Sequence, residues 1–242
     1  MPRGLPDDSN IVKQGGVYNL SDMAELAARL GSPLNYIRFG DVVFLTSFEH
    51  GYDMLYCSPA GGGAYGCLTS DFTRTKGTAV HLYTGTAADC GCPMRVILPC
   101  PITKHVGFGC AFKLGPGVVK IVLSSSLTRD DVLYSFRITF DLVTKLIYYD
   151  PTVGLPVSFA PHRLKANTWP FHVAKLVVDI DKPEYVRFYF DHESWKLSPA
   201  SGPVGPAVGL PSQIEYNISP CSALAAGCHL YVDDMVITQN DL

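Results

Sequence analysis

The clearest pattern in the chain is the alternation of apolar and polar residues on either side of a charged turn at residues 181–184. Before the turn, every second residue is apolar: Ala174, Leu176, Val178 and Ile180. After it, Val186, Phe188 and Phe190 alternate with the more polar Tyr185, Arg187, Tyr189 and Asp191. A period of two is typical of an antiparallel strand with one buried face. The two runs therefore predict a β-hairpin, with the polar set of the second run facing outward.

Similar patterns extend over most of the remaining chain. In residues 105–114, Val106, Phe108, Cys110, Phe112 and Leu114 alternate with small or polar residues. Shorter apolar runs occupy residues 42–45, 80–83, 94–98, 118–123, 134–140, 146–149 and 230–238. Turn signals separate them at intervals of roughly 8 to 12 residues, a spacing typical of sandwiches and barrels. The predicted fold class is all-β, a two-sheet antiparallel β-sandwich or jelly roll.

The N-terminal part does not follow this pattern. Residues 1–18 are rich in Pro and Gly and have no period, which indicates an arm. Residues 20–30 predict one short amphipathic helix, capped by Ser21 and ended by Gly31 and Pro33. We therefore divide the chain into residues 1–40, an arm with a short helix, and residues 41–242, the sandwich. Because so short a helix is marginal alone, it must dock on its own sandwich or, through residues 1–35, on a neighbouring subunit of a homo-oligomer or larger assembly.

Composition excludes several classes of partner. The 242 residues are 47% hydrophobic and 17% charged, enough for a sizeable core. The net charge is −3, and the 19 Lys and Arg residues are scattered, so nucleic acid is not an expected partner. No apolar window has the length of a membrane span or a signal-peptide core. We expect a protein made in the cytoplasm, without a membrane partner, that enters a virion or another released particle.

Three segments together resemble a known group of proteins. They are Phe48-Glu49-His50-Gly51, residues 169–176 with their partner 185–190, and residues 231–237. These segments resemble concanavalin A-like and laminin G-like jelly rolls, and also several carbohydrate-binding modules. The resemblance covers about residues 41–240 and implies the sandwich fold. Members of the group include lectins, glycan-binding modules, glycosidases, lyases and structural proteins of viruses, so the fold alone does not choose among these functions.

The resemblance also implies a structural calcium site. In related carbohydrate-binding modules, a Glu of the opening segment and an Asp of the closing segment hold Ca²⁺, which here would be Glu49 with Asp233 or Asp234. Carboxylate oxygens suit this hard cation, although two carboxylates fall short of the six to eight oxygen ligands it needs. The alternative is that Glu49 is simply exposed and that the two aspartates end a strand.

Glycan binding needs an aromatic platform with polar groups beside it. The residues expected to provide these groups are Tyr185, Arg187, Tyr189, Asp191 and Trp195. The alternative is that these aromatic side chains pack across strands and form no binding site.

Catalytic and cysteine chemistry have less support. Glycosidases of this fold commonly carry Glu-x-Asp-x-Glu along one strand, and the chain lacks it. Asp179 and Asp181 have a suitable spacing, but they lie where a strand enters a turn. The eight cysteines lack the usual two-residue zinc spacing, and disulfides such as Cys57–Cys67 or Cys221–Cys228 are the other interpretation.

These observations favour a non-catalytic structural or interaction module, glycan-binding and part of a larger assembly such as a phage virion. The alternatives are a carbohydrate-active enzyme, either a glycosidase or a lyase, and a stand-alone lectin.

Overall fold

The computed structural model describes residues 41–46, 48, 55–57, 62–74, 77–86, 91–100, 104–152, 154–165, 170–197, 201–222 and 227–241. The predicted arm and helix lie outside these residues. The described strands are β1 (Asp41–Thr46), β2 (Leu55–Cys57), β3 (Tyr65–Thr69), β4 (Ala79–Tyr83), β5 (Met94–Pro99), β6 (His105–Leu114), β7 (Val118–Arg129), β8 (Val132–Asp141), β9 (Leu146–Tyr149), β10 (Val157–Pro161), β11 (His172–Asp179), β12 (Glu184–Phe190), β13 (Glu193–Lys196), β14 (Val204–Pro206), β15 (Gln213–Ser222) and β16 (His229–Gln239).

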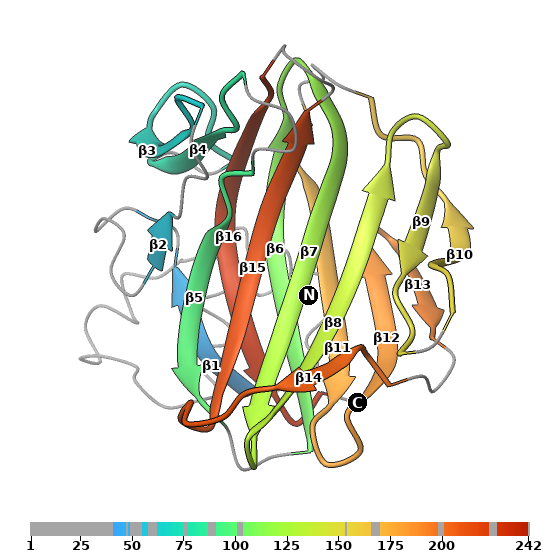
Figure 1. Cartoon of the computed structure of the whole chain (residues 1–242). Coiled ribbons are helices and arrows are strands. Elements are labelled where there is room, and N and C mark those ends of the chain that lie inside the picture. Colours follow the sequence, from blue (N-terminus) through green and yellow to red (C-terminus); the bar gives the residue numbers. More distant parts are fainter. Residues whose placement is uncertain are drawn as a thin grey trace, which may run out of the picture.

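The strands form two antiparallel sheets that face each other (Figure 1). Sheet A has the order β13-β12-β11-β6-β16-β4-β3, and β1 also pairs with β16. Sheet B has the order β10-β9-β8-β7-β15-β5-β2, and β14 also pairs with β8. The predicted all-β sandwich is confirmed, as is the predicted hairpin, which is β11 paired with β12. Within the described ranges, no helix is long and apolar enough to cross a membrane.

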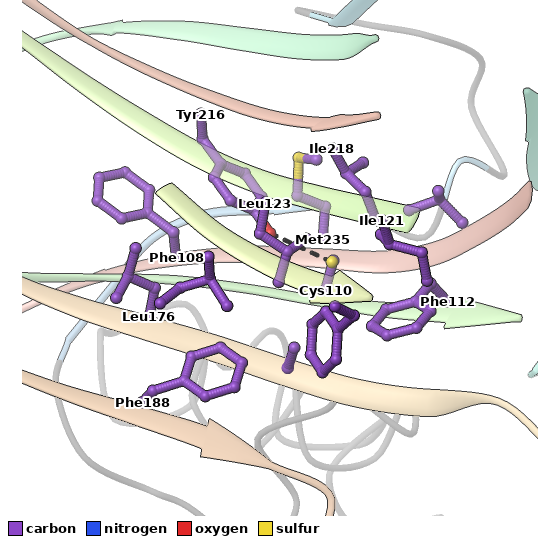
Figure 2. Packing of buried hydrophobic residues seen from close by; sticks show 14 of the residues in the cluster. Phe108, Cys110, Phe112, Ile121, Leu123, Leu176, Phe188, Tyr216, Ile218 and Met235 are labelled. Carbon is purple, nitrogen blue, oxygen red and sulfur yellow. Dashed lines mark hydrogen bonds between the residues drawn. The ribbon is translucent and has the colours of Figure 1, made fainter. Parts of the chain in front are cut away.

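The core lies between the sheets and is made by alternate residues of both. Figure 2 shows Phe108, Cys110 and Phe112 of β6 pointing toward Leu123 of β7 and Tyr216 of β15. The Tyr216 hydroxyl lies 3.2 Å from Cys110 Sγ and donates to it. Cys110 is a buried thiol, as its place on the apolar face predicts, and burial raises its pKa to about 12. The Tyr216 hydroxyl and the Cys110 thiol therefore satisfy each other inside the core.

Two β-bulges change which residues face the core. In the pairing of β11 with β12, Arg187 lies opposite Val177 and Tyr185 lies opposite Val178, so Val186 is the extra residue. A bulge shifts the alternation of all residues beyond it. As a result Tyr185 is 1% exposed and points into the core, so the prediction that it faces outward is wrong.

The Tyr185 hydroxyl is hydrogen-bonded to backbone groups of β8 and of the residue that follows β9. The N–H of Arg137 donates to it at 2.7 Å, and the hydroxyl donates to the carbonyl of Asp150 at 2.9 Å. The ring packs edge-on against Phe136, with centroids 5.2 Å apart. Tyr185 thus links sheet A to sheet B from inside the sandwich.

The second bulge lies in β16, where the pairing with β6 shifts between Asp233 and Met235. Asp234 is the extra residue, and its φ of 47° lies in the left-handed region. Before the bulge, Leu230 and Val232 enter the core; after it, Met235 and Ile237 do. The alternation of inward and outward residues in β16 therefore shifts by one position at the bulge.

Candidate functional site

The structure separates the five residues predicted to bind a glycan. Tyr185 lies in the core, and Trp195 packs from the core side on Phe159 and Phe188, with ring centroids 5.9 and 6.3 Å apart. On the opposite side of β12, Arg187 Nη1 donates to the Tyr189 hydroxyl at 3.1 Å. Tyr189 is only 5% exposed. The five residues do not form one open surface.

Asp191 lies at the turn between β12 and β13. Its carboxylate accepts the N–H of Val173 at 2.9 Å, and its other oxygen lies 2.8 Å from His172 Nδ1. Beside it is a cavity of about 360 Å³, lined by Pro161, His162, Arg163, Phe190, Asp191, His192 and Glu193. Both oxygens of Asp191 already hold the strand ends together, so the carboxylate has a structural role at this cavity.

A different set of side chains gathers at the other end of sheet A, on its outer face. Val80 and Leu82 of β4 enter the core, which turns His81 and Tyr83 outward. Leu230 and Val232 of β16 do the same for their neighbours. We call the resulting group the histidine–aromatic surface; it consists of Tyr65, Phe72, His81, Tyr83, His229 and Tyr231.

Strand register brings these residues into adjacent rows. Tyr83 lies directly opposite Tyr65 on β3 and His229 on β16, and His81 lies opposite Tyr231. Directly opposite residues of antiparallel strands have Cβ atoms about 4.5–5.5 Å apart, close enough for rings to touch. The surface is therefore a consequence of pairing between strands that are far apart in the chain.

The rings contact one another continuously. The centroids of His81 and Tyr231 lie 4.7 Å apart with ring planes at 12°, and those of Tyr83 and His229 lie 4.8 Å apart. Tyr65 packs edge-on against His81 at 5.5 Å. Tyr65 is 42% exposed, and the other rings are half-buried. The outer face at this end is a broad aromatic platform with polar edges.

The two histidines at its centre are hydrogen-bonded to each other. His81 Nε2 lies 2.8 Å from His229 Nδ1, so one nitrogen donates and the other accepts. Burial lowers the pKa of both rings, and for His81 the neighbouring His229 lowers it further, while Asp71 acts in the opposite direction. The pair is therefore neutral at pH 7, when one ring can accept the bond.

A short loop, residues 71–74, closes one side of the platform. Phe72 packs on Tyr231 with centroids 4.7 Å apart. Arg74 fixes the loop: its N–H donates to Asp233 Oδ2 at 2.8 Å, and its Nη1 to Asp234 Oδ2 at 3.1 Å. Asp233 and Asp234 are both buried. The bulge in β16 thus provides two adjacent carboxylates that bind one arginine.

This arrangement gives the predicted calcium ligands another cationic partner. Glu49 lies outside the described residues, so the calcium prediction stays a prediction. Within the described ranges, no group of three or more His, Cys, Asp or Glu side chains has a geometry that could hold a metal ion.

A cavity of about 420 Å³ adjoins the platform through Phe72. It is lined by Asp71, Phe72, Thr73, Arg74, Lys113 and Phe171. Lys113 Nζ lies 3.2 Å from the centroid of the Phe72 ring, a cation–π contact, and burial lowers the pKa of Lys113. The cavity therefore combines carboxylate, hydroxyl and cationic groups at the edge of an aromatic surface.

Asp179 and Asp181, whose spacing would suit a pair of catalytic carboxylates, lie at the turn of the β11–β12 hairpin. Asp179 Oδ1 accepts the N–H groups of Asp181 and Lys182 at 2.9 and 3.1 Å. This is the hydrogen-bonding pattern of an Asx turn, which stabilises the chain reversal.

Comparison with known proteins identifies the fold. No protein-family model and no curated protein matches the sequence. Among solved structures, the cellulose induced protein Cip1 has a TM-score of 0.55 at 12% identity, covering 81% of this chain and 96% of its own. A carbohydrate esterase of the Shiga toxin-encoding bacteriophage phi24B has a TM-score of 0.52 at 15% identity, covering 83% and 99%. The Bacillus licheniformis β-glucanase has 0.51 at 14% identity, covering 81% and 97%.

These likenesses show the concanavalin A-like jelly-roll fold, as the short sequence segments indicated. The neighbours include enzymes as well as a protein of unknown function, so the fold does not decide what this chain does.

The sequence carries a local signal for the two halves of the histidine–aromatic surface, although the predicted binding residues lie elsewhere. His81-x-Tyr83 and His229-x-Tyr231 have the same spacing, and in each case the apolar residues beside them mark the opposite face. The local pattern does not predict that β4 pairs with β16, which lies about 150 positions later in the chain.

Proposed function

We propose that this protein is a non-catalytic β-sandwich that binds a glycan on the histidine–aromatic surface and acts within a larger assembly such as a phage virion. The observation that carries the proposal is the continuous packing of six rings on the outer face of β3, β4 and β16. An aromatic face covers the apolar C–H side of a sugar ring and excludes water from it.

Polar groups at the margin supply the directional contacts that a sugar needs. Burial raises the pKa of the Tyr65 and Tyr231 hydroxyls, so both are neutral donors at pH 7. Asp71 and Thr73 line the adjoining cavity and can accept and donate to sugar hydroxyls. A saccharide that stacks on Tyr231 would place its next unit in this cavity, because Phe72 belongs to both.

The proposed non-catalytic role is supported by how the carboxylates described near the platform are bound. Cleavage of a glycosidic bond needs two carboxyl groups that face the same sugar. Among the described residues near the platform, Asp233 and Asp234 are buried and bind Arg74, whereas Asp71 is exposed beside the cavity. A bacteriophage esterase and a glucanase with the same fold support carbohydrate as the ligand class.

The test begins with a glycan array on the full-length protein, followed by calorimetry with the saccharide that binds best. We expect Tyr231→Ala and Tyr83→Ala to weaken binding at least about 10-fold, the effect of losing about 1.4 kcal/mol. The matched control is Tyr148→Ala, because Tyr148 is a tyrosine on β9 of the other sheet. Equal losses from Tyr148→Ala, or no bound glycan, would overturn the assignment.

The non-catalytic part is tested on the same saccharide. After long incubation with the protein, mass spectrometry should show the saccharide unchanged. Shorter products that disappear in Asp71→Asn or Asp179→Asn variants would instead establish the carbohydrate-active enzyme.

The assembly part is tested by deleting residues 1–35. We expect the full chain to have an oligomeric mass in solution and the deleted chain to be a folded monomer that still binds the glycan. If the deleted chain keeps the same number of subunits as the full chain, assembly through these residues is contradicted. A monomeric full chain would support the stand-alone lectin.

A further inference from the structure

Two cysteines lie on the same inner face at the edge of sheet B. Cys57, the last residue of β2, lies opposite Met94 of β5. Cys92 comes two positions before Met94, just ahead of β5, and both side chains are fully buried in the core between the sheets. In an antiparallel pair, residues related in this diagonal way are neighbours within reach of each other's side chains. Register thus places Cys57 beside Cys92 and not beside Cys67.

Local packing agrees with this register. The interaction between the two thiols raises the pKa of Cys57 and lowers the pKa of Cys92. Gly66 of β3 leaves room for the Cys57 side chain, because a Cβ at that position would overlap Cys57 Sγ. Cys67 instead lies opposite His81 on the outer side of β3, with its Sγ 4.0 Å from His81 Nδ1. The interpretation that Cys57 pairs with Cys67 therefore does not fit the strand geometry.

We propose that Cys57 and Cys92 are a disulfide-forming pair that closes when the protein meets an oxidant of the small-molecule disulfide class, such as glutathione disulfide. In the structure both are thiols. The half-exposed Cys57 exchanges first, forming a mixed disulfide and releasing one glutathione thiol. Cys92 then attacks the Cys57 sulfur and releases the second glutathione. The two protein thiols lose two electrons and two protons, and the glutathione disulfide gains both.

Closure of this bond would act on the strands that carry the histidine–aromatic surface. The segment between the two cysteines, residues 58–91, contains β3 and β4. A disulfide at its ends restricts the unfolded chain and ties the β3–β4 hairpin of sheet A to the edge of sheet B. Oxidation would therefore stabilise the β3–β4 hairpin, which is hydrogen-bonded to the remainder of sheet A through β16.

The experiment maps the bond in full-length protein after incubation with glutathione disulfide, alkylation of remaining thiols and tryptic digestion. Cys57 and Cys67 share the tryptic peptide 39–74, and Cys90 and Cys92 share the peptide 77–95. We expect these two peptides to be joined, and to remain joined in a Cys67→Ser/Cys90→Ser double variant. The bond should be absent from Cys57→Ser and Cys92→Ser.

A thermal melt supplies the second measurement. Oxidised wild-type protein and the oxidised double variant should each melt roughly 5 °C or more above their reduced forms, and dithiothreitol should reverse the rise. Separate, alkylated peptides after oxidation would overturn the proposal. So would a link that is lost in the double variant, because it would then run through Cys67 or Cys90.

Discussion

Two regions of sheet A carry alternating aromatic and polar side chains, and they are used in opposite ways. In β12, Tyr185 is buried and bonded to sheet B, and Tyr189 is 5% exposed beside Arg187. At β3, β4 and β16, Tyr65 is 42% exposed and the rings of neighbouring strands touch. The difference shows that alternation identifies residues on one face but does not say whether that face is open. One bulge is enough to move a tyrosine from the surface to the core.

The largest expected effect is the loss of stability in Tyr185→Ala. Removing a fully buried aromatic side chain costs about 3–5 kcal/mol of unfolding free energy. Tyr185→Phe keeps the ring but leaves the N–H of Arg137 and the carbonyl of Asp150 without this partner, at a cost of about 1–3 kcal/mol. Tyr65→Ala should change stability by less than about 0.5 kcal/mol. Urea unfolding of the three variants measures the contrast.

Similar unfolding free energies for Tyr185→Ala and Tyr65→Ala would contradict this contrast, because they would indicate that the Tyr185 side chain is exposed.

A smaller effect is expected from the predicted calcium site, which would involve the bulge at Asp233 and Asp234. If Glu49 and one of these aspartates bind Ca²⁺, free calcium at ten times Kd stabilises the fold by about 1.4 kcal/mol. The melting temperature should then fall on addition of a chelator, and Glu49→Ala should abolish the fall. Equal melting temperatures with and without chelator would remove calcium and leave Arg74 as the cation that these carboxylates bind.

The smallest expected effect concerns the pH dependence of the histidine–aromatic surface. The folded state lowers the pKa of His81 and His229, so the unfolded chain binds their protons more readily. The contribution of the pair is complete above about pH 6.5 and is lost as the pH falls from there toward the folded-state pKa values. Asp71 opposes the shift, while Lys113 adds a positive charge that faces this region.

The measurement compares melting temperatures between pH 7.5 and pH 5.5 in wild-type protein and in His81→Gln/His229→Gln. The double variant should lose less stability on acidification. His162, whose pKa burial also lowers, is unchanged in both proteins and so cancels from the comparison. Identical slopes would show that the histidine pair has no part in the pH response.

The parts of the fold that could be predicted are those fixed by local alternation. The β11–β12 hairpin, the apolar face of β6 and the sandwich class follow from the period of two and the turn residues between runs. The inward turn of Tyr185 could not be predicted, because Val186 is an ordinary strand residue and nothing in its sequence context marks it as the extra residue of a bulge.

The histidine–aromatic surface could not be predicted from the sequence for a different reason. Each half of the histidine–aromatic surface is visible as a short alternating run, but a platform exists only when β4 and β16 are adjacent. That adjacency depends on the order of strands in the sheet, which local patterns do not encode. The thiol that neighbours Cys57 could not be predicted for the same reason, since it depends on the pairing of β2 with β5.

The central position of β16 has a consequence for how the protein is made. This strand lies between β6 and β4 and also pairs with β1, yet it is the last described strand to leave the ribosome. Sheet A therefore cannot close until β16 has been translated, and until then β6 and β4 have edges that β16 does not yet pair. Such long-range pairing makes folding slow. Ligand binding should therefore appear only after β16 has been translated and has paired, and a nonsense mutation just before residue 229 should give an insoluble product.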